Sequence, residues 1–185
     1  DARNTSIDID GAGLTQRLAV QADRMTAHAR RNGADLDIAA YGENLRNSLV
    51  TGLSAKAFAF EATLSGKSSL LQIPLTPLHG PFEAMLHRIA IEFDETSSLE
   101  LAGPVQISAD GRVSGNLELT VSNLQLFSKL AADFNPKIAE LLRQFGPMIA
   151  ALDTKPGDDA TTLPLTIRSN QVSLGFIPLG ELPSF

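Results

Sequence analysis

The residue types that most often carry out chemistry in proteins are sparse in this sequence. There is no cysteine, which excludes thiol catalysis, cysteine–zinc sites and disulfide bonds. The three histidines are His28, His79 and His87. No pair of them has the helical spacing of a zinc protease, and no third ligand is evident beside His79 and His87. We interpret the histidines as surface or structural residues, and we expect no metal and no other cofactor.

Several acidic residues match part of a known functional motif, but the other residues of that motif are missing. The run from Asp8 to Gly11 resembles the start of a calcium-binding loop, but the twelfth position of that loop, normally glutamate, is Ala19. The adjacent acids at 94–95 and 158–159 point in different directions along an extended chain, so we interpret them as solvated charges rather than acid–base pairs. Serine-nucleophile, dinucleotide and phosphate-loop motifs are also missing. The sequence therefore predicts a protein that is not an enzyme.

One mildly basic cluster consists of Arg24, His28, Arg30 and Arg31. On a strand the first three would share a face, which we interpret as a solvated sheet face, with a weak anion-facing patch as the alternative. The net charge is −6, whereas binding to a phosphate backbone needs clustered basic residues. With no Trp and one Tyr, aromatic platforms for single strands are missing as well. We expect no nucleic-acid partner.

Alternating apolar residues around a tight turn predict a β-hairpin over 105–119. Asp110-Gly111 lies at its centre, where we expect a type I′ turn. A preceding strand is expected at 98–101, with a break at Gly103-Pro104. Two further strands are expected at 5–10 and 56–65.

Two more hairpins are predicted, one at each end of the chain. The first surrounds Asn32-Gly33, because apolar residues alternate on both sides of that pair. Residues 15–31 also fit an apolar helical stripe, so a helix remains the alternative there. The other hairpin joins 163–167 to 172–176 through Ser169-Asn170.

Helical spacing is clearest over 124–152, where apolar residues recur every three or four positions. Because Asn135-Pro136 has the pattern of a helix start, we expect one helix ending near Phe134 and a second beginning at Pro136. A shorter helix is expected from Pro81. The predicted fold class is therefore α+β: a curved antiparallel sheet built from hairpins, with two or three helices packed on one face, in a single domain over 1–185.

The apolar stripe of the 124–152 region has two interpretations. It can be solid core against the sheet, or it can line a groove for an acyl chain, since ligand sites are usually concave and apolar. The second interpretation makes these six residues the candidate ligand-binding set: Phe127, Leu130, Phe134, Leu141, Phe145 and Met148.

Several stretches of the chain resemble a known family. They are the segment 81–90 leading to a strand at 98–101, the hairpin 106–115, the closing run 163–183 and, more weakly, 24–30. The closing run is the most specific, with an apolar strand, a tight turn and a Leu-Gly-x-Ile-Pro-Leu-Gly-x-x-Pro terminus. These stretches resemble an uncharacterised domain-of-unknown-function family of Gram-negative envelope proteins that are exported or membrane-anchored. All of these motifs concern packing and turns.

The resemblance implies a periplasmic or cell-envelope location, with a signal or membrane anchor before Asp1, so that the chain is the C-terminal part of a longer protein. It implies no reaction and no functional residues. We expect a non-catalytic envelope domain that binds a lipid or another apolar ligand. The alternative is a structural or interaction module that pairs through an exposed sheet edge.

Overall fold

The fold is a single antiparallel sheet in which every strand pairs with the next one along the chain. The structure is a computed structural model, and it describes residues 1–9, 18–47, 54–72, 80–125, 140, 144, 148, 151–155 and 160–182. Within these residues, ten strands follow the order β1 to β10 without a crossover. Their bounds are β1 Ala2–Ile9, β2 Leu18–Asn32, β3 Asp35–Asn47, β4 Ser54–Leu64, β5 Phe82–Glu92, β6 Ser98–Ile107, β7 Val113–Val121, β8 Thr161–Arg168, β9 Gln171–Leu174 and β10 Ile177–Glu181.

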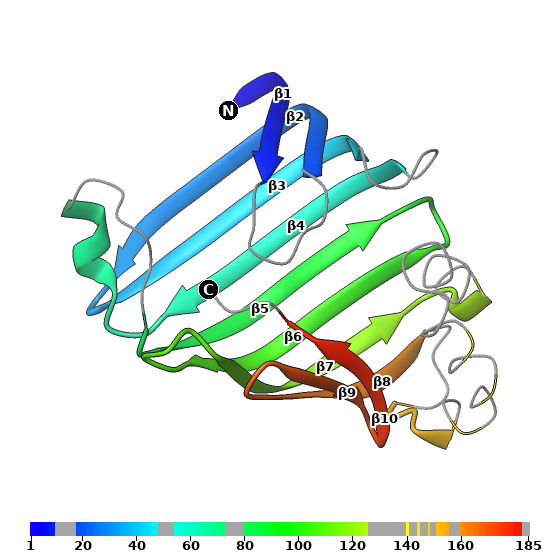
Figure 1. The fold of residues 1–185 in the computed structure, drawn as a ribbon. Coiled ribbons are helices and arrows are strands. Elements are labelled where there is room, and N and C mark those ends of the chain that lie inside the picture. The colour runs from blue at the N-terminus through cyan, green and yellow to red at the C-terminus, as the bar shows by residue number, and fades with distance from the viewer. Residues whose placement is uncertain are drawn as a thin grey trace.

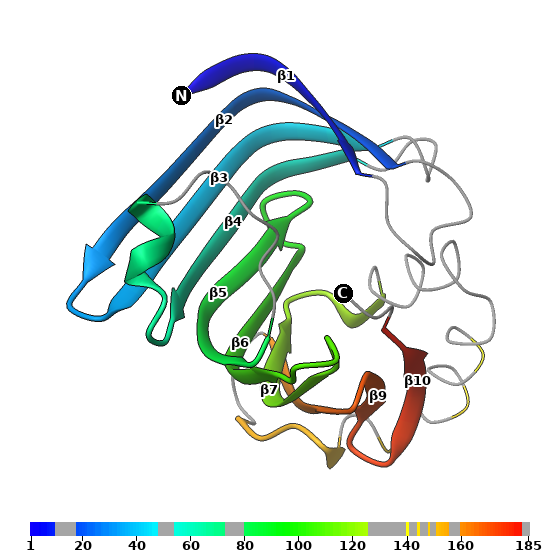
Figure 2. The same ribbon diagram turned by 60° about the vertical axis from the view of Figure 1, so that its left-hand side comes forward.

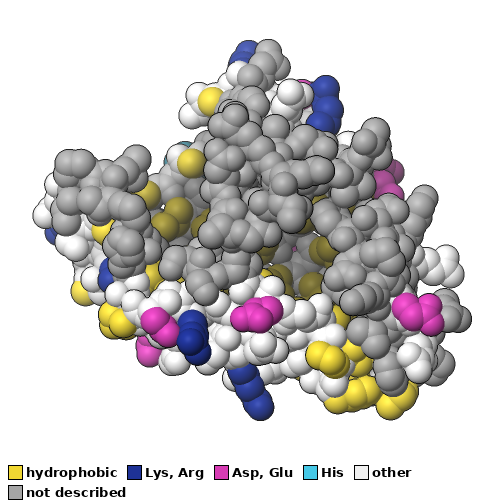
Figure 3. Space-filling view, viewed as in Figure 1, with side chains coloured by type: hydrophobic (Ala, Val, Ile, Leu, Met, Phe, Trp, Pro, Cys, Tyr) yellow, Lys and Arg dark blue, Asp and Glu magenta, His cyan; other side chains and the backbone are white. Residues whose placement is uncertain are grey.

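The sheet bends into a trough, with β1–β4 forming one wall and β8–β10 curling round at the other (Figures 1 and 2). Side chains alternate between the two faces of a strand, so the pairing register decides which residues lie inside. Figure 3 shows hydrophobic side chains in the depth of the trough, where described residues are visible. We call this the inner face and the opposite one the outer face.

The inner face holds two clusters of buried side chains. The larger cluster runs from Leu36 on β3 through Leu64, Phe82 and Val105 to Ile167 on β8. The smaller one joins β7 to the last three strands and contains Leu119, Val121, Leu163, Leu174 and Ile177. Both clusters lie on the inner face. Their strands alternate apolar and polar residues, as expected for a sheet with one buried face.

The α+β class predicted from the sequence is wrong. In the described residues the chain is almost entirely β. Its helical parts are the five-residue 3-10 helix η1, Ser68–Gln72, and the few described helical residues at 124–125, 140, 144, 148 and 151. The two helices expected within 124–152 fall largely outside the described residues, so they cannot support that class. No helix in the described part of the chain has the length and hydropathy needed to cross a bilayer.

The short helix expected from Pro81 is the strand β5 instead. Its inner-face residues are Phe82, Ala84, Leu86, Ile89 and Ile91, with a register shift between Leu86 and Ile89. This β-bulge inserts an extra residue and turns one step of two into a step of three. Three-residue spacing is the signature of a helix, and the bulge reproduces it inside a strand.

Lysine substitutions at adjacent positions of β5 test this assignment. Ala84 is buried on the inner face and Met85 is 43% exposed on the outer face. We expect Ala84→Lys to lower the free energy of unfolding by about 2 kcal/mol or more, because it places a charge in a packed core. Met85→Lys should change it by less than about 0.5 kcal/mol. Urea denaturation measures both, and a helix from Pro81 would give the reverse order, since Met85 lies on its apolar stripe and Ala84 does not.

The hairpins predicted at both ends are present, and residues 18–32 are strand rather than helix. β2 and β3 meet at Gly33, whose φ is 63°, and β8 and β9 meet at Ser169 and Asn170, with φ of 47° and 73°. The two adjacent positive φ angles at Ser169 and Asn170 are those that a type I′ turn requires. The strands expected at 5–10 and 56–65 correspond to β1 and β4.

The central hairpin differs in two details. Of Asp110 and Gly111, only Gly111 has a positive φ, so the turn over 108–112 is not type I′. The break expected at Gly103-Pro104 lies inside β6, which continues to Ile107. Gly103 has a φ of 139°, and a Cβ there would lie 2.6 Å from the carbonyl oxygen of Asn116. The glycine thus permits a close approach of two strands instead of ending one.

Candidate functional site

The inner face carries a strip of apolar side chains that are only half-buried. Two rows cross three strands: Phe58 pairs with Ile91 and then Leu99, and Phe60 pairs with Ile89 and then Leu101. All six are intermediate in exposure, whereas Leu163 and Leu174 on the same face are fully buried. We call these six residues the apolar strip.

The ligand-binding residues expected from the sequence are a different set from the six of the apolar strip. Five of them, Phe127, Leu130, Phe134, Leu141 and Phe145, lie outside the described residues. The sixth, Met148, is described, and its side chain is 48% exposed. The strip was missed because its residues belong to strands whose inward face becomes recognisable only when the register is known.

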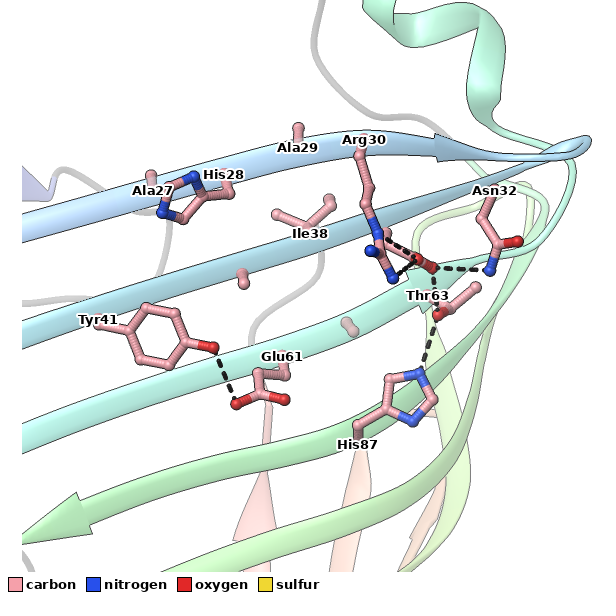
Figure 4. Close-up of a pocket in the computed structure, with 13 residues that line it drawn as sticks. Ala27, His28, Ala29, Arg30, Asn32, Ile38, Tyr41, Glu61, Thr63 and His87 are labelled. Carbon is pink, nitrogen blue, oxygen red and sulfur yellow. Dashed lines mark hydrogen bonds and ion pairs between the residues drawn. The ribbon is translucent and has the colours of Figure 1, made fainter. Parts of the chain in front are cut away.

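The outer face contains a polar groove of about 910 Å³ above β2–β5. Figure 4 shows the side chains that project into it. His28 and Arg30 come from β2, Asp37 and Tyr41 from β3, Glu61 and Thr63 from β4, and His87 from β5. We call this the outer groove.

One end of the outer groove is fixed by a network centred on Asp37. Arg30 Nε donates to one carboxylate oxygen at 3.0 Å. Thr63 Oγ1, at 2.8 Å, and Asn32 Nδ2, at 3.3 Å, donate to the other. These donors, led by the Thr63 hydroxyl, hold the pKa of Asp37 below its usual value.

The same network sets the proton position on His87. Its Nε2 lies 2.8 Å from Thr63 Oγ1. Because the single hydroxyl proton of Thr63 goes to Asp37, Thr63 accepts from His87, so His87 Nε2 carries hydrogen. His87 is the extra residue of the β5 bulge, opposite no residue of β4. The bulge directs this side chain toward Thr63, a known use of bulges.

The other end of the groove is formed by Tyr41 and Glu61. The Tyr41 hydroxyl donates to Glu61 Oε1 at 3.0 Å. This hydrogen bond to a carboxylate raises the pKa of Tyr41 above its ordinary value. Between the two ends the β3 position is Ala39, which pairs with His28 on one side and Glu61 on the other. A small residue therefore forms the floor between polar walls.

The basic cluster seen in the sequence is divided by the strand. Arg24, His28 and Arg30 share the outer face, as expected for a strand, and Arg31 lies on the other face. Arg24 forms an ion pair with Asp1 at 3.1 Å and Arg30 with Asp37 at 3.0 Å. The cluster is thus a neutralised sheet face rather than an anion-binding patch.

The other residues considered in the sequence, the adjacent acids and His79, lie either in a turn or outside the described residues. Asp94 and Glu95 are exposed in the β5–β6 turn, where the Thr96 amide donates to Asp94 at 2.8 Å and lowers the pKa of Asp94. His79 and the acids at 158–159 lie outside the described residues. Within the described parts of the chain, no group of three or more His, Asp or Glu residues is placed to hold a metal ion.

Acid is expected to weaken the fold through Asp37. A carboxyl whose folded pKa is depressed stabilises the protein above its unfolded pKa, and this contribution is lost as pH falls through the folded pKa. We expect the wild type to lose more stability between about pH 5 and pH 2 than Asp37→Asn does. Urea denaturation at several pH values measures the difference. Glu43→Gln, which removes an exposed carboxylate from the same face of β3, is the control for the loss of one negative charge. A loss of stability in the wild type no greater than that in Asp37→Asn contradicts the prediction.

Fold and site together define a class: a curved antiparallel β-sheet domain with an apolar inner face and a polar outer face. A comparison with known protein families identifies the family of this chain. The family described as "Uncharacterized protein conserved in bacteria (DUF2125)" matches residues 1–183, so the chain belongs to this family. No curated protein and no solved structure matches the chain.

Proposed function

We propose that this protein is a non-catalytic binding domain that holds a lipid acyl chain, or a similar elongated apolar ligand, along the inner face of its sheet. The observation that carries the proposal is the apolar strip, where six large hydrophobic side chains across β4–β6 remain half-buried. Concave sites lined by hydrophobic residues are the usual form of binding sites for apolar ligands.

The register gives the strip a direction. Its two rows run across the strands, so an extended chain lying over it would contact Phe58, Ile91 and Leu99, or Phe60, Ile89 and Leu101. Each CH₂ group buried there would contribute about 0.8 kcal/mol. Several such groups would offset the entropy lost on binding. Charged residues such as Glu61, Arg88 and Glu100 lie on the outer face of the same strands, away from the strip.

We further propose that the domain works in the bacterial envelope. This rests on the resemblance of the closing run 163–183 to exported and membrane-anchored proteins. A ligand with acyl chains suits that location.

Site-specific photo-cross-linking tests the binding proposal. A benzophenone amino acid is placed at Phe60 on the inner face and, as a matched control, at Tyr41 on the outer face of the adjacent strand. The purified variants are irradiated with vesicles of phosphatidylethanolamine and phosphatidylglycerol and analysed by intact mass. We expect a lipid adduct at position 60 at several times its level at position 41. Equal labelling, or no adduct at position 60, contradicts the proposal.

A second candidate function is pairing through a sheet edge. Within the described residues, β1 and β10 each have a single neighbouring strand, so each leaves backbone groups on one side without a strand partner. Such edges are templates for another chain. Light scattering over a range of concentrations should then show an oligomer, and a monomer at all concentrations argues against this function.

A further inference from the structure

We propose that the outer groove is a second binding site and that it binds a neutral oligosaccharide. This goes beyond the function proposed above, because the groove lies on the opposite face of the sheet from the apolar strip. Its volume of about 910 Å³ lies at the upper end of the range for small-molecule sites, about 300–1,000 Å³.

The internal network leaves both donors and acceptors free to face a ligand. Both carboxylate oxygens of Asp37 accept hydrogen bonds from Arg30, Asn32 and Thr63. Asp37 therefore holds the groove together instead of contacting a ligand. Glu61 uses Oε1 for Tyr41 and keeps Oε2 available. His87 uses Nε2–H for Thr63 and presents Nδ1 as an acceptor. His28, which also lines the groove, supplies a ring N–H donor in its neutral form. Sugar hydroxyls both donate and accept, and this mixed set of groups suits them.

The charge of the groove favours a neutral ligand. Arg30 is neutralised by Asp37 at 3.0 Å, which leaves Glu61 as the remaining formal charge within the groove. A phosphate or uronate would meet that carboxylate with no free cation to oppose it, and like charges repel. A polycation would find a single carboxylate. The neutral hydroxyl groups of a sugar are not repelled by Glu61 and do not need several carboxylates to bind.

The shape of the groove also fits a sugar ring. Ala39 forms a low floor, with His28 and Glu61 on its two sides along the pairing direction. Tyr41 stands two residues further along β3 with 40% of its surface exposed. Its ring can lie against the C–H face of a sugar while its hydroxyl stays fixed on Glu61 (Figure 4). An apolar ring face beside hydrogen-bonding groups is a chemical match to a hexose.

The test is a titration of the isotope-labelled protein with cellotetraose, maltotetraose and chitotetraose, followed by amide NMR shifts. We expect saturable shifts at residues 26–41 and 59–63 with at least one of the three. Ala39→Leu fills the floor and should weaken that binding at least tenfold. Ala55→Leu, the same change on the outer face of β4 but outside the groove lining, should leave it unchanged.

Glu61→Gln provides a second variant that keeps the side-chain shape. We expect it to weaken the neutral sugar by removing a strong acceptor. The proposal is overturned if none of the three sugars shifts these amides at millimolar concentration. It is also overturned if Ala39→Leu binds as tightly as the wild type, or if a sulfated oligosaccharide binds the groove more tightly than the neutral ones. Fold integrity is checked by an unchanged urea midpoint.

Discussion

Leu163→Ala is expected to lower the free energy of unfolding by about 2–5 kcal/mol. Leu163 on β8 is 0% exposed and packs in the cluster with Val121, Leu174 and Ile177. Removing its branched end deletes buried methyl groups and leaves a cavity that neighbouring strands cannot fill, because they are held by the backbone ladders on both sides. The cost therefore combines lost burial with a cavity.

The matched control is Leu71→Ala. Leu71 lies in η1 and is 46% exposed, so the same chemical change should alter stability by less than about 0.5 kcal/mol. Thermal and urea unfolding of both variants measures the difference. Equal effects at the two positions would mean that the β7–β10 cluster is not a packed core.

Asn170→Ala is expected to cost about 2–4 kcal/mol of stability, although Asn170 lies in a two-residue turn. The side chain is 2% exposed, and its Oδ1 accepts the Val113 amide at 2.6 Å. The backbone of Asn170 also donates to Val113 O and accepts from the Leu182 amide. One residue thus ties β7, the β8–β9 turn and the end of β10 together. Alanine would leave the buried Val113 amide without its acceptor and would occupy a positive φ.

Ser169→Ala separates these two causes. Ser169 also has a positive φ, 47°, but its side chain is exposed. We expect a change below about 0.5 kcal/mol, since alanine and serine tolerate this backbone region about equally. Asn170→Gly should be intermediate, because glycine relieves the backbone and still lacks the acceptor. If Asn170→Ala matched Ser169→Ala, the Asn170–Val113 hydrogen bond would have no energetic importance.

Local pattern was reliable wherever a strand was regular and its turn was tight. The alternation around Asn32-Gly33 and around Ser169-Asn170 identified two hairpins, and the β1 and β4 strands were expected close to their true positions. These signals are local, because a two-residue turn and its flanking alternation fit within a few residues. The basic residues Arg24, His28 and Arg30 were placed on one face for the same reason.

The pattern failed where a strand was irregular. The bulge near His87 gave β5 the spacing of a helix, and Gly103-Pro104 suggested a break within β6 that the strand does not have. Neither irregularity can be recognised without the neighbouring strand, because a bulge is defined by two residues facing one.

The order of the amino acids was enough to show a cysteine-free chain with a net acidic charge, hairpins at 32–33 and 169–170, and membership of an uncharacterised bacterial family. The almost entirely β character of the described residues, the apolar strip and the outer groove became visible only in the tertiary structure. Asp37, Thr63 and His87 are spread over 50 residues of sequence and meet because β3, β4 and β5 pair in one register. Register is set by packing of the whole inner face, since a slip of one residue would turn every side chain to the opposite side.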